Sequence, residues 1–166
     1  MHKKFQKKLV WLIILICLQI TFIFLSNKIE INNQIYNNLL FITATLIISM
    51  TIYIILTIII SKFPSFLEDG IWKKPFFTLL IGTFALLILS VLILFIFNNL
   101  NTNPTMTRSL TFIMGYPITF VLILMIESFF RKLLNTHNRE KVLFYSSISI
   151  VLSLTLIILV GKLNNI

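Results

Sequence analysis

The stretch Phe41–Ser61, FITATLIISMTIYIILTIIIS, is almost entirely apolar and contains no charged residue. A helix needs roughly 20 apolar residues to cross the hydrocarbon core of a membrane, so this stretch is long enough to do so. Similar runs recur along the chain, and Glu127 is the only charged residue inside any of them. The five runs are 9–25, 39–60, 76–97, 110–130 and 142–160. Because lipid offers no partner to unpaired backbone groups, we predict an all-α integral membrane bundle of five transmembrane helices, forming a single domain over residues 1–166.

The overall composition agrees with this prediction. Of the 166 residues, 58% are hydrophobic and 11% are charged, and the mean hydropathy is +1.00, whereas a soluble domain is about a quarter charged. The first run follows several lysines, which is also the layout of a secretory signal peptide. It is long for a signal peptide, and residues 22–27 offer no small-residue cleavage site. We therefore expect an uncleaved first span.

Basic residues gather in alternate segments between the runs. The richer set is Lys3, Lys4, Lys7, Lys8, Lys62, Lys73, Lys74, Arg131, Lys132, Arg139 and Lys141. The other segments hold only Lys28, Arg108 and Lys162. This is the positive-inside pattern, and it predicts a cytoplasmic N-terminus and an extracytoplasmic C-terminus. The net charge of +9 then matches anionic lipid headgroups on the cytoplasmic side. Nucleic acid is not expected as a partner, because no basic fold or aromatic platform accompanies the charge.

The segment 61–75, SKFPSFLEDGIWKKP, combines apolar residues with charges. We expect it to lie at the inner membrane interface, with Trp72 as an aromatic anchor and Lys73 and Lys74 at headgroup level. The alternative is a docking loop for a cytoplasmic protein. The bias of the whole chain towards Ile, Leu, Phe, Asn and Lys over Ala and Gly suits an AT-rich bacterial genome, and hence a bacterial plasma membrane.

The sequence contains little that could support catalysis. His2 and His137, the two histidines, lie outside the apolar runs, and neither belongs to a metal-binding pattern such as HExxH. Cys17 is the single cysteine, and the four glycines form no nucleotide-binding loop. We therefore expect no enzymatic activity, no metal and no cofactor.

Polar or small residues recur every fourth position in the second run, at Thr45, Ser49, Tyr53, Thr57 and Ser61. Four residues turn a helix by about 400°, so this row drifts about 40° at each step. A straight pore lining would hold one face of the helix. A row of this spacing instead favours contact between helices at a close crossing, with Ser and Thr acting as the small residues of a chain that has little Gly or Ala.

Other polar residues fall at similar depth in their spans. The fifth run carries Ser146, Ser149 and Ser153 on one face, and Gln19 lies in the first run. Hydrocarbon cannot satisfy the Gln19 amide, so we predict that it points into the bundle and bonds to a serine or threonine there. Structural contact is the favoured role for Gln19, and a substrate site is the alternative.

The fourth run contains Glu127 four residues before Arg131, a spacing that places both on one face of a helix. We predict an ion pair of the helix-surface kind between them, worth about 0.5 kcal/mol. Tyr116 and Thr119 lie on nearly the same face as Glu127, so a polar stripe serving transport is the alternative. Pro117 in this run is expected to bend the helix.

These features predict a small non-enzymatic multi-pass membrane protein that acts through contacts inside the membrane. It would be an accessory subunit of a membrane complex, or an immunity protein that protects against a membrane-active toxin. Its partners would be other membrane proteins or further copies of itself. The alternative function is a transporter or channel component with a polar pathway lined by Gln19, Tyr53, Tyr116 and Glu127.

Overall fold

The computed structural model describes residues 2–28, 34–63, 74–99, 104–134 and 138–163. All regular structure in these ranges is helical: α1 (His2–Lys28), α2 (Gln34–Lys62), α3 (Pro75–Asn99), α4 (Pro104–Leu134) and α5 (Arg139–Leu163). Each helix is long and apolar enough, by length and composition, to cross a membrane. The predicted all-α fold with five such helices is therefore confirmed, and the architecture fits a multi-pass membrane protein.

Local sequence explains where several helices begin. α3 and α4 begin at Pro75 and Pro104, and proline suits a first helical position because its missing N–H would have no partner in the helix there. Pro117 lies inside α4, which is helical on both sides of it. All five helices extend beyond the predicted apolar runs at both ends, because the polar and basic residues that flank the runs continue the helices.

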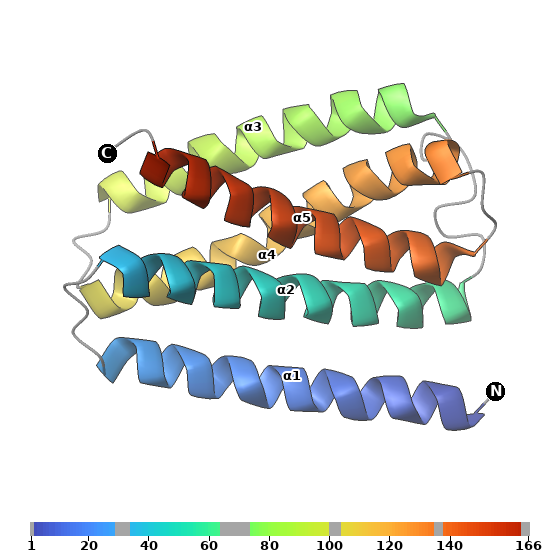
Figure 1. The fold of residues 1–166 in the computed structure, drawn as a ribbon, viewed down its shortest axis with the longest axis horizontal. Coiled ribbons are helices and arrows are strands. Elements are labelled where there is room, and N and C mark those ends of the chain that lie inside the picture. Colours follow the sequence, from blue (N-terminus) through green and yellow to red (C-terminus); the bar gives the residue numbers. More distant parts are fainter. Residues whose placement is uncertain (1, 29–33, 64–73, 100–103, 135–137, 164–166) are drawn as a thin grey trace.

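Three helices form the centre of the bundle and two lie outside it. α2, α4 and α5 pack against one another, α1 lies against α2 and α4, and α3 packs chiefly on α4. Figure 1 shows α1 and α3 on opposite sides of the bundle, with α4 and α5 crossing between them. In the most apolar window of α1 and of α3 only 6% of the residues are buried, against 39% in α2. The two outer helices therefore leave most of their surface uncovered.

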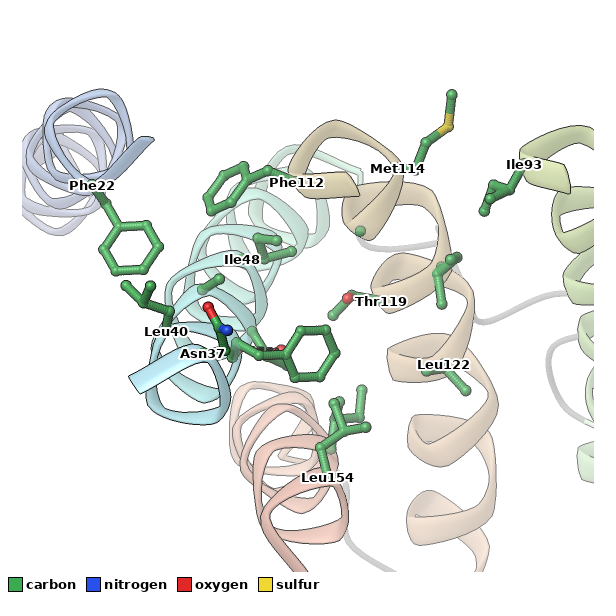
Figure 2. A pocket seen from close by; sticks show the side chains of 16 residues that line it. Phe22, Asn37, Leu40, Ile48, Ile93, Phe112, Met114, Thr119, Leu122 and Leu154 are labelled. Carbon is green, nitrogen blue, oxygen red and sulfur yellow. Dashed lines mark hydrogen bonds between the residues drawn. The ribbon is translucent and has the colours of Figure 1, made fainter. Parts of the chain in front are cut away.

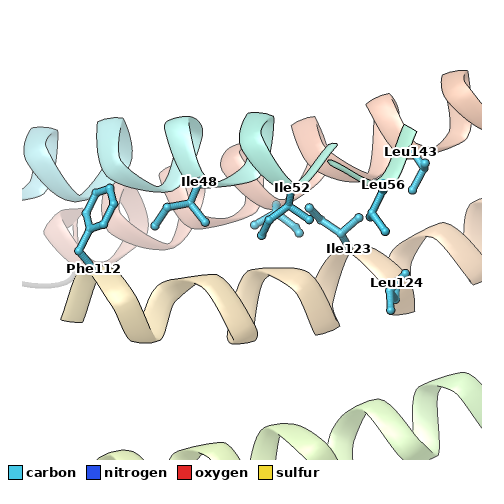
Figure 3. Packing of buried hydrophobic residues seen from close by; sticks show 8 residues of the cluster. Ile48, Ile52, Leu56, Phe112, Ile123, Leu124 and Leu143 are labelled. Carbon is cyan, nitrogen blue, oxygen red and sulfur yellow. The ribbon is translucent and has the colours of Figure 1, made fainter. Parts of the chain in front are cut away.

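The buried core follows the contact between α2, α4 and α5. Its apolar residues are Ile48, Ile52 and Leu56 of α2, Phe112, Ile123 and Leu124 of α4, and Leu143 and Ile150 of α5. Figure 3 shows this cluster along the facing sides of α2 and α4, with α3 farther away. Lipid tails are as apolar as these side chains, so removal from lipid does not by itself drive helices together. Close packing of the side chains against one another holds the helices in place.

One end of the bundle carries the described charge contacts. The Lys8 ammonium lies 2.6 Å from a carboxylate oxygen of Glu140, which joins the start of α1 to the start of α5. The Lys62 ammonium at the end of α2 lies 5.3 Å from the centre of the Phe5 ring. These contacts place the start of α1, the end of α2 and the start of α5 together, as an alternating up-and-down bundle requires.

Candidate functional site

A buried polar cluster joins three helices near the middle of the bundle. Gln19 of α1 is 7% exposed, and its Nε2 donates a hydrogen bond to Oγ1 of Thr51 on α2 at 2.6 Å. The hydroxyl of Tyr116 on α4 donates to Oε1 of Gln19. Thr51 in turn donates to the backbone carbonyl of Ile47 at 2.8 Å. Both ends of the Gln19 amide are thus bonded to helices that neighbour α1.

The pattern of α1 explains why Gln19 points inward. Leu12, Leu15, Phe22 and Ile23 are partly buried, while most residues between them are exposed. Spacings of three and four residues place these side chains and Gln19 on one face of a helix. The α1 surface that meets α2 and α4 therefore consists of apolar contacts around one amide.

We expect replacement of Gln19 by leucine to destabilise the attachment of α1 by about 1 kcal/mol, because hydrogen bonds between membrane helices average about 0.6 kcal/mol and two are lost. Unfolding in mixed detergent, followed by circular dichroism, measures the change. Gln6→Leu is the control, because Gln6 is exposed on the same helix. A Gln19→Leu variant as stable as the wild type would contradict this structural role.

The polar row of α2 lies on more than one side of the helix. Thr45, Ser49 and Thr57 are buried, Tyr53 is partly buried and Ser61 is exposed. The hydroxyls of Thr45, Thr57 and Ser61 donate to backbone carbonyls of α2 itself, at Phe41, Ile54 and Ile58. The hydroxyl of Ser49 has no hydrogen-bond partner among the described residues. In the described part of the chain, the hydrogen bonds made by this row therefore stay within α2.

Tyr53 makes an aromatic contact. Its ring meets the Phe144 ring of α5 edge to face, with ring centres 5.7 Å apart. Such pairs contribute beyond simple area burial. The bulky member of the α2 row thus packs against α5.

The serines of α5 are buried to different extents. Ser146 is buried, Ser149 is partly buried and Ser153 is exposed, although all three share one helix face. Ser147, which the spacing argument omitted, is buried. α5 crosses α4 at an angle, and its second half runs away from α2 (Figure 1), so the face that is covered at Ser146 is uncovered at Ser153. Ser146 and Ser147 donate to the carbonyls of Val142 and Leu143 in their own helix.

The ion pair predicted on α4 is present but lies deeper than expected. Nε of Arg131 donates to Oε1 of Glu127 at 3.0 Å, and a second guanidinium nitrogen donates to the same oxygen. The Glu127 side chain is only 2% exposed and that of Arg131 is 20% exposed. The prediction of a helix-surface pair was therefore wrong about depth, because neighbouring helices cover the carboxylate.

Other contacts in the same half of the bundle join α3 to α4. The hydroxyl of Ser128 lies 3.3 Å from that of Thr78, and both residues are buried. Gly82, one turn along α3, is buried against Met125 of α4. Small residues on α3 thus allow the two helices to approach closely.

Of the predicted interfacial anchors, Trp72 and Lys73 lie outside the described residues. Lys74 is exposed, and its ammonium lies 5.5 Å from the centre of the Phe77 ring. In the described parts of the chain, no three His, Cys, Asp or Glu side chains come together as metal ligands.

The residues of the predicted polar stripe of α4 do not act together, because each has a different neighbour. Tyr116 contacts Gln19, Glu127 pairs with Arg131, and Thr119 faces a cavity between α2 and α4. The structure brings together Gln19 and Tyr116 from the sequence-predicted set, and it adds Thr51. Comparison of the chain with protein-family models, with curated proteins and with solved structures finds no match.

Proposed function

We propose that this chain is a multi-pass protein of a bacterial plasma membrane that acts, without enzymatic chemistry, through contacts with other proteins inside the membrane. It would serve as an accessory subunit of a membrane complex or as a protective protein against a membrane-active toxin. The observation that carries the proposal is the uncovered surface of the outer helices. α1 and α3 present large apolar side chains along their length, among them Ile20, Phe84 and Leu87.

The internal bonding of the bundle supports this proposal. The polar groups of α1, α2 and α4 at Gln19, Thr51 and Tyr116 bond to one another, and buried hydroxyls of α2 and α5 bond to their own helices. These polar groups therefore stabilise the fold. The outward faces of α1 and α3, the two least buried spans, are then left for a partner helix.

We further propose a cytoplasmic N-terminus and an extracytoplasmic C-terminus. Lys8 and Glu140 form an ion pair at one end of the bundle, where Lys62 lies against the Phe5 ring. Arg131 and Lys132 at the end of α4, and Arg139 and Lys141 at the start of α5, lie at helix ends that an alternating bundle places there. Of the basic residues in these two helices, only Arg108 and Lys162 lie at the opposite ends. Excess basic residues favour the cytoplasmic side. A reporter enzyme that is active only outside the cytoplasm, fused after Ile166, checks this orientation.

Photo-crosslinking in intact cells tests the partner proposal. A photoreactive amino acid at Phe84 of α3 or Ile20 of α1 is expected to crosslink the chain to a second membrane protein, which then co-purifies in mild detergent. Leu156 is the matched control, because it is equally exposed but lies on α5. Equal crosslinking from all three positions, or a protein that purifies alone and transports solutes in liposomes, would contradict the proposal.

A further inference from the structure

A cavity of about 480 Å³ lies between the helices in the half of the bundle away from the N-terminus. α2 and α4 form most of its wall, and Phe22 of α1, Ile93 of α3, and Ile150 and Leu154 of α5 complete it. Figure 2 shows these helices arranged around one space. The volume falls within the range of roughly 300–1,000 Å³ that is typical of small-molecule sites.

The position of the cavity follows from the crossing of α4 and α5. Beyond the crossing the two helices diverge towards the end of α5 (Figure 1), and Gly115 of α4 presents no side chain to the space. A Cβ at Gly115 would lie 3.0 Å from the Ile48 side chain, so α2 and α4 remain close beside the cavity. The helices therefore hold the space open as part of the fold.

The wall of the cavity excludes a charged ligand. None of its sixteen described lining residues is charged, and burying a carboxylate or phosphate without a countercharge is costly. Most of the lining is aliphatic or aromatic, with Phe22, Phe41 and Phe112 among it. An uncharged molecule with a hydrocarbon chain matches this surface.

One polar group in the wall points to a specific contact. Thr119 is 6% exposed, and Figure 2 shows its side chain projecting from α4 towards the space. Its hydroxyl has no hydrogen-bond partner among the described residues. Thr45 also lines the cavity, but its hydroxyl already donates to the Phe41 carbonyl at 2.9 Å. The amide of Asn37 also lines the cavity, but Asn37 is exposed. Thr119 is therefore the buried donor left for a ligand, and a carbonyl oxygen is the neutral acceptor that suits it.

We propose that this cavity binds a lipid-soluble quinone, with the Thr119 hydroxyl donating a hydrogen bond to a ring carbonyl and the tail lying along the apolar wall. The ring explains the aromatic lining, since flat rings stack or meet edge to face with phenylalanine. An acyl lipid also fits the apolar wall and carries ester carbonyls, but it has no ring to meet these phenylalanines. The inference concerns binding alone and is independent of the proposed partner contacts.

Binding of decylubiquinone to the purified protein in phosphatidylcholine nanodiscs tests this assignment. The wild type is expected to bind it saturably. Thr119→Val, which keeps the shape but removes the hydroxyl, is expected to bind roughly tenfold more weakly, as loss of about 1.4 kcal/mol implies. Thr45→Val is the matched control and is expected to change affinity less than about twofold, because its hydroxyl is already used within α2.

Competition by other lipids, together with one further variant, distinguishes a quinone from other possible occupants of the cavity. Palmitate and phosphatidylglycerol, which are charged, are expected to compete poorly, and so is dioleoylglycerol, which has carbonyls but no ring. Thr119→Ser is expected to retain binding, and the unfolding midpoint of every variant shows that it is folded. Unchanged affinity in Thr119→Val, equal losses in both valine variants, or competition by the other lipids as strong as by the quinone would overturn the proposal.

Discussion

Replacing Arg131 with alanine is expected to destabilise the protein by about 3 kcal/mol, the lower end of what breaking a buried ion pair costs. The Glu127 side chain is only 2% exposed, and one of its oxygens accepts two hydrogen bonds from the guanidinium group. Without Arg131 the carboxylate would remain buried without its countercharge. The lower end applies because the Arg131 side chain is itself 20% exposed. Unfolding in mixed detergent, monitored by circular dichroism, gives the free-energy change.

Two further variants show whether the pair itself is responsible. Lys132→Ala removes the neighbouring, exposed basic residue and is expected to change stability by less than about 0.5 kcal/mol. Glu127→Gln combined with Arg131→Ala removes both charges and is expected to recover most of the loss. If Arg131→Ala and Lys132→Ala had equal effects, or if the double variant were no more stable than Arg131→Ala alone, the pair would not have the role assigned to it.

The same ion pair shows how far the sequence could predict the candidate site. The four-residue spacing of Glu127 and Arg131 was enough to predict the contact, because it is a property of one helix. Depth was not predictable, because it depends on how neighbouring helices cover α4. The five helices were predictable for the same local reason, since each apolar run is long enough to span a membrane by itself.

The contacts between helices could not be predicted from the spacing of residues along a single helix. The inward orientation of Gln19 followed from its polarity, but its partner Thr51 lies off the four-residue row of α2. α2 is surrounded by α1, α4 and α5, so it buries residues on several sides and one row describes only part of its contacts. The exposure of Ser153 was not predictable from spacing for a related reason, because the crossing angle of α5 exposes a helix face that is buried one turn or two earlier.

Close approach of α3 to α4 leads to the second large expected effect. Gly82 is buried, and a Cβ at its position would overlap the middle of the Met125 side chain. Gly82→Leu is therefore expected to force the two helices apart and to destabilise their contact by about 1–3 kcal/mol, the usual cost of overpacking. Because α3 packs chiefly on α4, the damage should be confined to α3. Spin labels on α3 and α4 would report the increased separation.

A second substitution distinguishes overpacking from a general weakness of α3. Met125→Ala in the Gly82→Leu background makes room for the leucine, so the double variant is expected to be less destabilised than the sum of the two single variants. Thr83→Leu is the control, because Thr83 is exposed on the adjacent position of α3 and should tolerate leucine within about 0.5 kcal/mol. Additive effects of Gly82→Leu and Met125→Ala would contradict the close contact. If the double variant is less destabilised than the sum, α3 is held on α4 through this contact. The surface of α3 proposed to meet a partner is then the opposite face of the helix.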